Sequence, residues 1–301
     1  MHTHDLDITV DKISKIEGHA DLDIKVRNGE VTEVNLRVME NQRFYTQAVQ
    51  GKSVLAVPQL VSRICGTCSI AHLTCCIEAI EKTLDVKITE QTMLLRKLTM
   101  YSLMIRDHAL HLYFFVLPDL FGIDSVLDLP EDKKAILHQA LHVKEAGNNL
   151  SKLVAGRAVH APFEQVGGFV SIPDNDKVQP VIAELKSVRQ YVIDLADMFL
   201  SCHWDFKRQT NFVALVTPDF SFLEGEIHTS SGKVVAEKDF FDHLKNVILP
   251  YSKASGFEFE GKEFMVGALA RLNLNKEALH SNTKKDMKRF LDLFPSNNVC
   301  H

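Results

Sequence analysis

The chain has 301 residues and a formal net charge of −5, with 46% hydrophobic and 24% charged residues. This composition is ordinary for a soluble protein, and the charge gives no sign of the basic patch that nucleic-acid binding requires. Six cysteines in a chain of this length do not make a disulfide framework. The length allows one or two domains, and we expect a single domain over residues 1–301.

No segment predicts export or membrane insertion. Residues 1–5 lack a basic region followed by an apolar run, so we expect no signal peptide. The most apolar long segment, Thr92 to Phe121, contains Arg96, Lys97, Arg106 and Asp107. A bilayer span needs about 20 mostly apolar residues, so this segment predicts a buried helix. A reducing cytoplasm is the simplest compartment.

The N-terminal region, from Ile8 to Arg37, is the one clearly β-rich part of the sequence. Residues 20–26 alternate apolar and polar side chains, as a half-buried strand does. Asn28-Gly29 is a two-residue hairpin signal, after which residues 31–38 are predicted to pair back. Residues 8–13 are expected to add a third strand.

A cysteine motif follows. Cys65 and Cys68 stand three positions apart around Gly66, and His72 comes four positions after the second cysteine. Glycine allows a tight turn in which both sulfurs face one point, and thiolates are soft ligands for nickel, iron, zinc and copper. His72 is expected one helical turn beyond Cys68 on the same face, where it could donate a hydrogen bond to that sulfur or bind metal.

The residues after the motif predict a helix from Ser69 to Leu84. Apolar side chains recur at helical spacing within it, at Ile70, Leu73, Ile77 and Ile80. The partial positive charge of a helix N-terminus favours thiolate over thiol at Cys68. Taken alone, the motif leaves four interpretations open: a redox-active nickel–iron site, a thioredoxin-like dithiol, half of a zinc site, and a pair of buried small residues.

Long helices are predicted beyond this point. One covers 90–117 and is expected to end at Pro118, a second runs from Pro130 to about residue 154, and a third runs from Asp174 to about residue 200. Shorter helices are predicted over 237–248 and 283–293, and a small excursion with a turn at Ser231-Gly232 over 225–235. Long antiparallel helices with modest loops suggest a bundle core. The predicted fold is therefore mainly α with an N-terminal β-hairpin region, of the α+β class.

Three motifs in this order resemble the large, catalytic subunit of nickel–iron ([NiFe]) hydrogenases of the cytosolic, bidirectional type. Lys15-Ile16-Glu17-Gly18-His19 is similar to the family's R-[IV]-E-G-H motif, and the run 63–68 with His72 is similar to RxCGxCxxxH. Residues 156–162, continuing to Gly167-Gly168, are similar to GRxxHP…GG. Residues 266–272 and 294–296 also resemble segments of this branch, so the resemblance covers nearly the whole chain.

The resemblance implies a long-helix bundle of the hydrogenase large-subunit type and a nickel–iron centre whose iron carries two cyanides and one carbon monoxide. Cys65 would be a terminal nickel ligand and Cys68 a bridge to iron, with His72 donating a hydrogen bond to the bridging sulfur. H2 would be cleaved heterolytically, the proton passing from a terminal thiolate to Glu17. Arg157 and His160 form a basic pair on a loop beside Gly167-Gly168 and, with Arg63, are expected to line the metal pocket; the alternative is a loop that its glycines simply fix in place.

The resemblance also implies partners. Electrons must leave through iron–sulfur clusters, and this sequence has no four-cysteine cluster run, so a separate iron–sulfur small subunit is expected. The family uses a second motif, DPCxxC, to supply two further thiolates. No second CxxC occurs here, so we expect a C-terminal segment or a separate polypeptide to supply it.

One departure weakens a predicted accessory site. The family commonly has a glutamate where this chain has Thr46, in Arg43-Phe44-Tyr45-Thr46, and that glutamate helps to bind magnesium or iron. A threonine is a poor substitute, because hard divalent cations prefer carboxylate oxygen. Two rival functions remain: a non-catalytic structural subunit of a hydrogenase-like or respiratory complex, and a zinc or dithiol protein that uses only Cys65 and Cys68.

Overall fold

A computed structural model describes residues 5–13, 16, 18–40, 43–203 and 206–296. The chain groups into two compact units. We call residues 1–50 with 238–264 the hairpin unit, and residues 51–237 with 265–301 the helical unit. The prediction that the whole chain is a single domain stays a prediction.

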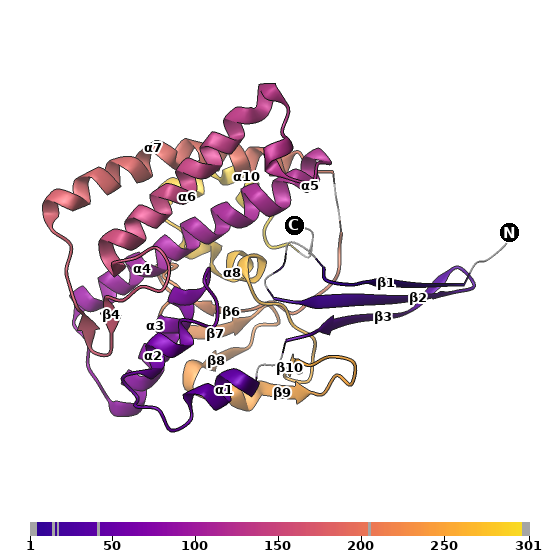
Figure 1. Cartoon of the computed structure of the whole chain (residues 1–301), viewed down its shortest axis with the longest axis horizontal. Coiled ribbons are helices and arrows are strands. Elements are labelled where there is room, and N and C mark those ends of the chain that lie inside the picture. The colour runs from indigo at the N-terminus through magenta and orange to yellow at the C-terminus, as the bar shows by residue number, and fades with distance from the viewer. Residues whose placement is uncertain (1–4, 14–15, 17, 41–42, 204–205, 297–301) are drawn as a thin grey trace. The chain divides into compact units, whose positions relative to one another are not determined.

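The hairpin unit begins with a three-stranded antiparallel sheet. Strands β1 (Leu6–Val10), β2 (Ala20–Arg27) and β3 (Glu30–Val38) pair in the order β1-β2-β3 (Figure 1). The turn residues Asn28 and Gly29 both have left-handed backbones, with φ of 54° and 81°, as the predicted Asn-Gly hairpin requires. The β-rich region is therefore confirmed, although its first strand lies slightly earlier than predicted.

The second half of the hairpin unit corrects one prediction. Helix α1 (Arg43–Val49) follows the sheet, and later the chain forms the 3-10 helix η4 (Glu237–His243). The helix predicted over 237–248 is wrong beyond residue 243, because β9 (Leu244–Val247) pairs antiparallel with β10 (Gly256–Phe259). A short apolar run is ambiguous between helix and strand, and here the pairing with a distant segment decides it.

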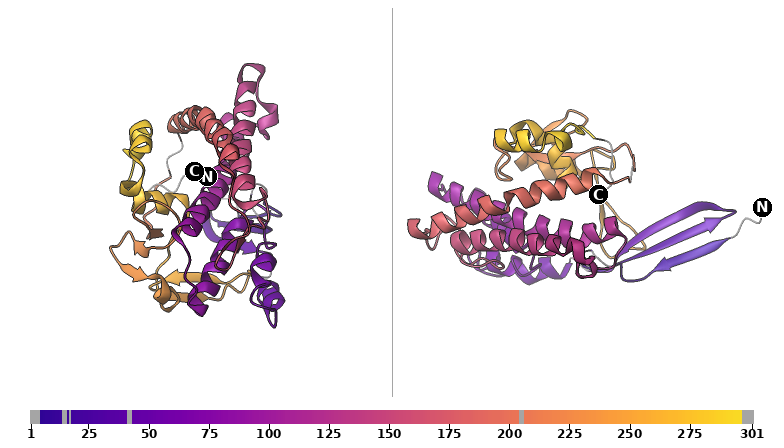
Figure 2. Two further views of the ribbon diagram at one scale, coloured as in Figure 1. Left: turned by 90° about the vertical axis from the view of Figure 1, so that its left-hand side faces the viewer. Right: turned by 90° about the horizontal axis from the view of Figure 1, so that it is seen from above.

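The helical unit contains three long helices that lie side by side (Figures 1 and 2): α4 (Glu90–Ala109), α6 (Lys134–Ala155) and α7 (Asn175–Leu200). Its remaining elements are α2 (Val57–Val61), α3 (Ser69–Leu84), η1 (Leu110–Val116), α5 (Leu117–Phe121), η2 (Val126–Asp128), η3 (Glu131–Lys133), β4 (Glu164–Gln165), β5 (Gly168–Phe169), β6 (Val213–Val216), β7 (Glu226–Thr229), β8 (Val234–Ala236), α8 (Ala268–Asn275), η5 (Lys276–Ala278), α9 (Ser281–Asp286) and α10 (Lys288–Leu291). This composition confirms the predicted α+β fold with a core of long helices.

Two predicted helices end as expected. Helix α3 covers the predicted residues 69–84, and its apolar stripe is buried, with Ile70, Leu73 and Ile77 fully inaccessible. Helix α6 ends at Gly156, whose φ of 85° is left-handed. A side chain at Gly156 would also collide with Phe163, 2.7 Å from the added carbon. Glycine is therefore needed there for both conformation and space.

The helix expected to stop at Pro118 does not stop there. After α4 the chain widens into η1, a π-helical segment in which the Leu117 N–H donates to the Leu112 carbonyl, and α5 follows directly. Pro118 lies in the first turn of α5, where its missing N–H does no harm. Gly122, with φ of 64°, ends the run instead.

The sheet β6-β7-β8 was not predicted as a sheet, although its turn was: Gly232, at the predicted Ser231-Gly232 turn, has φ of 88° between β7 and β8. Helix α7 begins after Asp174 and ends at Leu200, as predicted. The predicted helix over 283–293 is two short helices, α9 and α10, divided at Met287. Across the described ranges, every helix is too short or too polar to span a bilayer.

Candidate metal centre

The cysteine motif forms a loop between two helices of the helical unit. Helix α2 ends at Val61, the loop covers residues 62–68, and α3 begins at Ser69. Cys65 and Cys68 are joined in a disulfide, with 5.5 Å between their Cα atoms. The backbone N–H of Cys68 and the Thr67 hydroxyl both lie 3.3 Å from the Cys65 sulfur. The two sulfurs therefore meet at one point, with polar hydrogens directed at one of them.

Gly66 is less demanding than its place in the motif suggests. Its backbone is not left-handed, and a side-chain carbon placed on it would meet only Val159, at 3.9 Å. Within this chain, neither strain nor crowding requires glycine at position 66. The tight turn depends instead on hydrogen bonds, such as that from the Ser69 N–H to the Gly66 carbonyl at 3.4 Å.

The cysteines lie at a helix N-terminus that is firmly anchored. Cys68 is the N-cap of α3, and no side chain caps the free N–H groups of the first turn. The partial positive charge of a helix N-terminus stabilises negative charge on a nearby sulfur. The apolar stripe of α3 packs in a core with Met100 and Leu103 of α4 and Leu150 of α6. The core therefore fixes the direction from which the half-buried sulfurs are presented.

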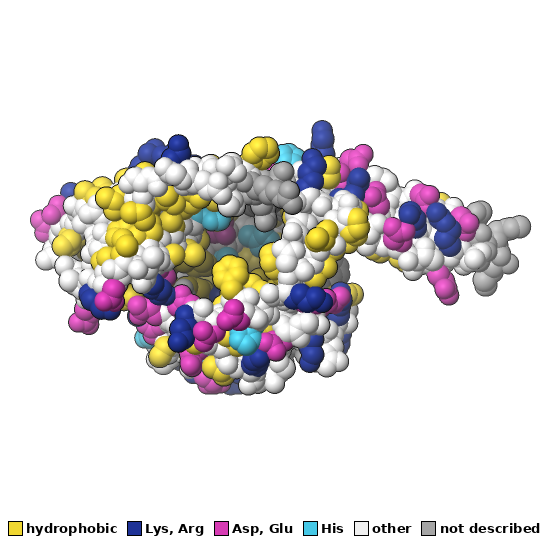
Figure 3. Space-filling view, turned by 90° about the horizontal axis from the view of Figure 1, so that it is seen from below, with side chains coloured by type: hydrophobic (Ala, Val, Ile, Leu, Met, Phe, Trp, Pro, Cys, Tyr) yellow, Lys and Arg dark blue, Asp and Glu magenta, His cyan; other side chains and the backbone are white. Residues whose placement is uncertain are grey.

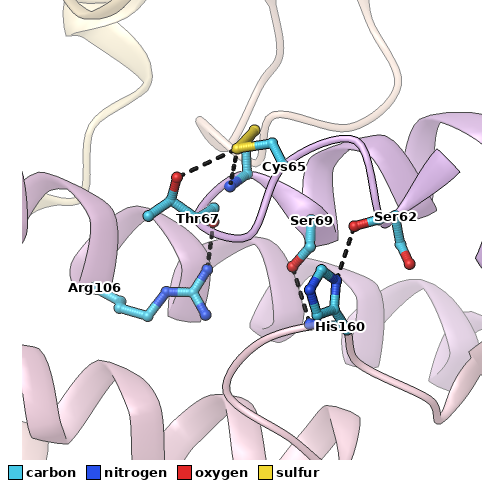
Figure 4. Close-up of a disulfide and its surroundings, with 7 residues drawn as sticks. Ser62, Cys65, Thr67, Ser69, Arg106 and His160 are labelled. Carbon is cyan, nitrogen blue, oxygen red and sulfur yellow. Dashed lines mark hydrogen bonds between the residues drawn. A yellow bond between two sulfur atoms is a disulfide. The ribbon is translucent and has the colours of Figure 1, made fainter. Parts of the chain in front are cut away.

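His160 joins the central motif to both ends of the cysteine loop (Figure 4). Its backbone N–H donates to the Ser69 hydroxyl oxygen at 3.0 Å, and its ring Nδ1 lies 2.9 Å from the Ser62 carbonyl oxygen. Because a carbonyl only accepts, Nδ1 must carry the hydrogen. His160 has a left-handed backbone, with φ of 54°, and both serines are fully buried. Its ring thus holds the loop in place through the Ser62 carbonyl.

Arg106 reaches the same loop from α4. Its Nη2 donates to the Thr67 carbonyl at 2.5 Å, and Figure 4 shows the guanidinium directed at the loop on the side of Thr67. Arg106 is 4% exposed, and burial lowers the pKa of its guanidinium. Sequence reasoning treated Arg106 only as a charge that argues against a membrane span. Its one sequence signal was its place as a charged residue in the most apolar long segment.

The other predicted site residues are distributed as follows. His72 is half-buried one turn into α3, with its backbone N–H donating to the Cys68 carbonyl at 3.2 Å. The side chains of Arg63 and Arg157 are exposed. Thr46 is exposed on α1 of the hairpin unit. Glu17 lies outside the described residues.

A buried ionic cluster lies farther along α3. Arg96 of α4 donates through both terminal nitrogens to Glu81, at 2.7 Å each, and its Nε lies 3.1 Å from Glu164. Glu164 also accepts from the Thr74 hydroxyl at 2.8 Å, and Glu81 accepts from the Gly167 N–H at 2.7 Å. The cluster therefore attaches the glycine pair of the central motif to α3 and α4.

The charges in this cluster do not balance. One guanidinium faces two carboxylates, and both of its terminal nitrogens are engaged with Glu81. Burial raises the pKa of Glu164 to about 7, although the Thr74 hydrogen bond and Arg96 both act to lower it. The pKa of Glu81 is lowered, because Arg96 and the Gly167 N–H outweigh its burial. We therefore assign the negative charge to Glu81 and a proton to Glu164 up to about neutral pH.

The described residues offer a limited set of metal ligands. No group of three or more His, Cys, Asp or Glu side chains is placed there to hold one ion. The cysteine pair itself fits a soft metal, since two sulfurs meet at the N-terminus of a helix, in a loop that a buried cation contacts. Chemically, the pair can chelate a metal as two thiolates or exchange electrons as a dithiol.

Comparison with known proteins finds similarity to nickel-dependent hydrogenases. Residues 43–157 match the family model described as nickel-dependent hydrogenase. The chain is 28% identical over 294 residues to the alpha subunit of sulfhydrogenase 2 of Pyrococcus furiosus, an alignment that covers 98% of this chain and 69% of the relative. It is 26% identical over 326 residues to the beta subunit of the NAD-reducing hydrogenase HoxS of Cupriavidus necator, covering 94% of this chain and 66% of that protein.

Solved structures share the fold. An NAD+-reducing nickel–iron hydrogenase in its H2-reduced state superposes with a TM-score of 0.85 at 21% identity, covering 98% of this chain and 71% of that one. The reduced nickel–iron–selenium hydrogenase of D. vulgaris Hildenborough gives a TM-score of 0.76 at 22% identity, covering 98% and 72%. The arrangement of elements described above is thus that of hydrogenase large subunits.

Proposed function

We propose that the chain is a catalytic large subunit of the nickel-dependent hydrogenase family and that it cleaves H2 reversibly into protons and electrons. The cysteine pair carries this proposal, because Cys65 and Cys68 bring two sulfurs to one point at the N-terminus of α3. When bound there, a nickel–iron centre would supply the site at which H2 is polarised and split. The finer composition of that centre, with cyanide and carbon monoxide on iron, is part of the proposal.

A role is proposed for each of the site residues of this chain. Cys65 and Cys68 hold the metals as thiolates, and His72 orients the Cys68 sulfur by hydrogen bonding. His160 positions the loop, a role supported by its bonds to Ser62 and Ser69. Arg63 and Arg157 remain candidates for contacts at the rim of the pocket.

Proton transfer is assigned to Glu17. A carboxylate suits this work because partial burial can raise its pKa towards neutrality. A magnesium site at Thr46 remains a weak candidate, since that residue offers only a hydroxyl oxygen.

Partners are needed to complete the chemistry. Two thiolates leave nickel open to competing ligands, so a polypeptide segment with a second CxxC is proposed to supply the other two. An iron–sulfur small subunit is proposed to take the electrons. The apolar side chains of Val54, Leu55 and Leu60, just before the cysteine loop, are 43%, 72% and 41% exposed. Figure 3 shows that hydrophobic side chains gather in patches on the surface, and exposed apolar patches mark sites of partner binding.

We propose a cytoplasmic location for the chain and these partners.

One observation favours a second candidate. The pair is joined as a disulfide at a helix N-terminus, which is also the arrangement of a dithiol-exchange site. A zinc protein that uses the same two sulfurs as ligands is the other form of this second candidate. Neither would need nickel, iron or H2.

Metal analysis of the assembled complex separates these functions. The chain should be co-expressed with a source of the second CxxC, the maturation proteins and its small subunit. Nickel and iron in a one-to-one ratio per chain, infrared bands of bound cyanide and carbon monoxide, and H2-dependent dye reduction are expected. Zinc alone, or a metal-free complex with dithiol activity, would contradict the proposal, and a metal-free complex without activity would favour a structural subunit.

A further inference from the structure

Arg106 is held against the cysteine loop by close backbone packing. Helices α4 and α6 approach so closely at this point that a side-chain carbon added to Gly147 would lie 2.8 Å from the Arg106 backbone nitrogen. The absence of a side chain at Gly147 therefore sets how near α6 comes to α4. The position of Arg106 is fixed by the helix pair, and its guanidinium reaches the carbonyl of Thr67, the residue just before Cys68.

Within the part of the chain that the structure describes, the Arg106 guanidinium has no counter-charge. Among the described residues, no carboxylate lies within 4.0 Å of it, and its Nη1 is buried without a hydrogen-bond partner. Asp107, the next residue, is the acidic group nearest enough to affect its pKa, and burial outweighs that effect. Arg96, the other buried arginine of α4, has Glu81 and Glu164 beside it. A buried cation left unpaired is strongly unfavourable, so a partner is expected.

The cysteine pair is the group that can become that partner. A disulfide is neutral, whereas the reduced pair, free or metal-bound, carries up to two negative charges. Reduction by glutathione balances as follows: two glutathione thiols are oxidised to one glutathione disulfide, and the Cys65–Cys68 bond breaks to give two thiols. Loss of their protons to solvent or on metal binding leaves thiolates next to the residue that Arg106 contacts.

We propose that Arg106 is a positioning residue that acts as the built-in counter-charge of the Cys65–Cys68 pair. Nη2 fixes the loop through the Thr67 carbonyl, and the buried positive charge of the guanidinium stabilises the negative charge of the reduced state. That negative charge lies on a thiolate sulfur or on an anionic ligand of the bound metal. The metal-bound form of this inference rests on the proposed function, whereas the thiolate form does not.

The first test measures the thiol–disulfide equilibrium of the full chain in glutathione buffers, without metal. Arg106→Met and Arg106→Gln remove the charge and should lower the equilibrium constant for reduction about tenfold or more, as expected when a thiolate loses a nearby opposite charge. Arg106→Lys keeps the charge and should change it less. Arg289→Met removes an exposed arginine, 79% accessible, and is the matched control.

Equal equilibrium constants in wild type, Arg106→Met and Arg106→Gln, within about twofold, would overturn the proposal. Circular dichroism identifies any variant that fails to fold. If Arg106→Met does not fold, the test is the comparison of Arg106→Gln, which keeps polar atoms under the loop, with Arg106→Lys, which also keeps the charge.

The second test uses the metal-loaded complex and distinguishes the two locations of the negative charge. If Arg106 stabilises an anionic ligand of the bound metal, the infrared bands of bound cyanide should shift in Arg106→Gln relative to wild type. Unshifted bands together with an altered thiol–disulfide equilibrium would place the charge that Arg106 stabilises on sulfur. A wild-type complex without nickel or iron would contradict the proposed function while leaving the glutathione result to decide the role of Arg106.

Discussion

Arg96 donates to Glu81 through both terminal nitrogens of its guanidinium, each 2.7 Å from a carboxylate oxygen, although the two side chains are only 1% and 7% exposed. A buried, bidentate pair of this kind is costly to break from one side, because the remaining charge loses both water and partner. Here the pair also joins α3, which presents the cysteines, to α4, which presents Arg106.

We expect Arg96→Met to lower the free energy of unfolding by about 3–5 kcal/mol, the usual cost of leaving one member of a buried pair alone. Urea denaturation of the full chain, followed by circular dichroism, measures this loss. Arg289→Met removes an exposed arginine that lies 3.6 Å from Asp197 and should change stability by no more than about 0.5 kcal/mol. Equal effects of the two substitutions would show that the buried pair contributes no more than a surface pair.

Glu164 should make stability depend on pH. Its pKa in the folded chain is about 7, above the ordinary 4.5, so between these values the unfolded chain has lost a proton that the folded chain keeps. Stability from this group is therefore full below pH 4.5, falls as pH rises, and is lost above pH 7. The total change is about 3 kcal/mol, at roughly 1.36 kcal/mol per pKa unit.

Glu164→Gln should remove this dependence, because glutamine has no proton to lose. The free energy of unfolding of wild type and variant is measured at pH 5 and at pH 8. From pH 5 to pH 8 the wild type should lose stability relative to the variant. Parallel curves for the two proteins would place the folded-state pKa of Glu164 near its ordinary value and refute the assigned proton.

His160 should control the order of the cysteine loop. His160→Ala removes the ring donor to the Ser62 carbonyl and leaves the backbone bond to Ser69, so nickel content should fall several-fold while the fold survives. His160→Asn tolerates the left-handed backbone and offers a shorter donor, and should retain more metal. His203→Ala, at an exposed position outside the loop, is the control. Full nickel content in His160→Ala would argue against a positioning role.

Cys68→Ser should abolish nickel binding and H2 turnover in the assembled complex, because serine does not supply the soft thiolate that the site requires. The matched control is Cys75→Ser, which changes an exposed free cysteine on the same helix. Elemental analysis and dye reduction under H2 give the two measurements. Wild-type nickel and activity in Cys68→Ser would exclude Cys68 as a ligand.

Glu17→Gln should slow proton-coupled turnover and leave nickel bound, since glutamine keeps the shape of glutamate but cannot ionise. Hydrogen–deuterium exchange between D2 and water, catalysed by the metal-loaded complex, reports on this step directly. Glu30→Gln, on an exposed strand of the hairpin unit, serves as the control. An unchanged exchange rate in Glu17→Gln would mean that protons leave by another route.

Local patterns predicted the parts of the fold that local interactions determine. The apolar spacing of α3 and the Asn28-Gly29 turn each depend only on residues that are close together in the sequence, and both elements lie where they were expected. Strand β9 was misassigned as helix because its identity depends on pairing with residues 256–259. No pattern inside its own four residues carries that information.

The same limit applies to the site. The turn that brings Cys65 and Cys68 together is local and was predicted from the spacing of the two residues. The bond from Arg106 to Thr67 joins residues 39 positions apart, and that from His160 to Ser62 joins residues 98 positions apart. Packing of α3, α4 and the central loop creates these contacts, so they are visible only in three dimensions.

The π-helical segment between α4 and α5 has a geometric consequence for the core. Ala109, Tyr113 and Leu117 are all buried and stand four residues apart. In a regular α-helix each four-residue step rotates a side chain about 40° past its predecessor, so the third would drift well off the inner face. The wider turn of η1 offsets part of this rotation. The wider turn therefore corrects the rotation of the helix. Side chains spaced by four residues, which do not match 3.6 residues per turn, still form one continuous line in the interior.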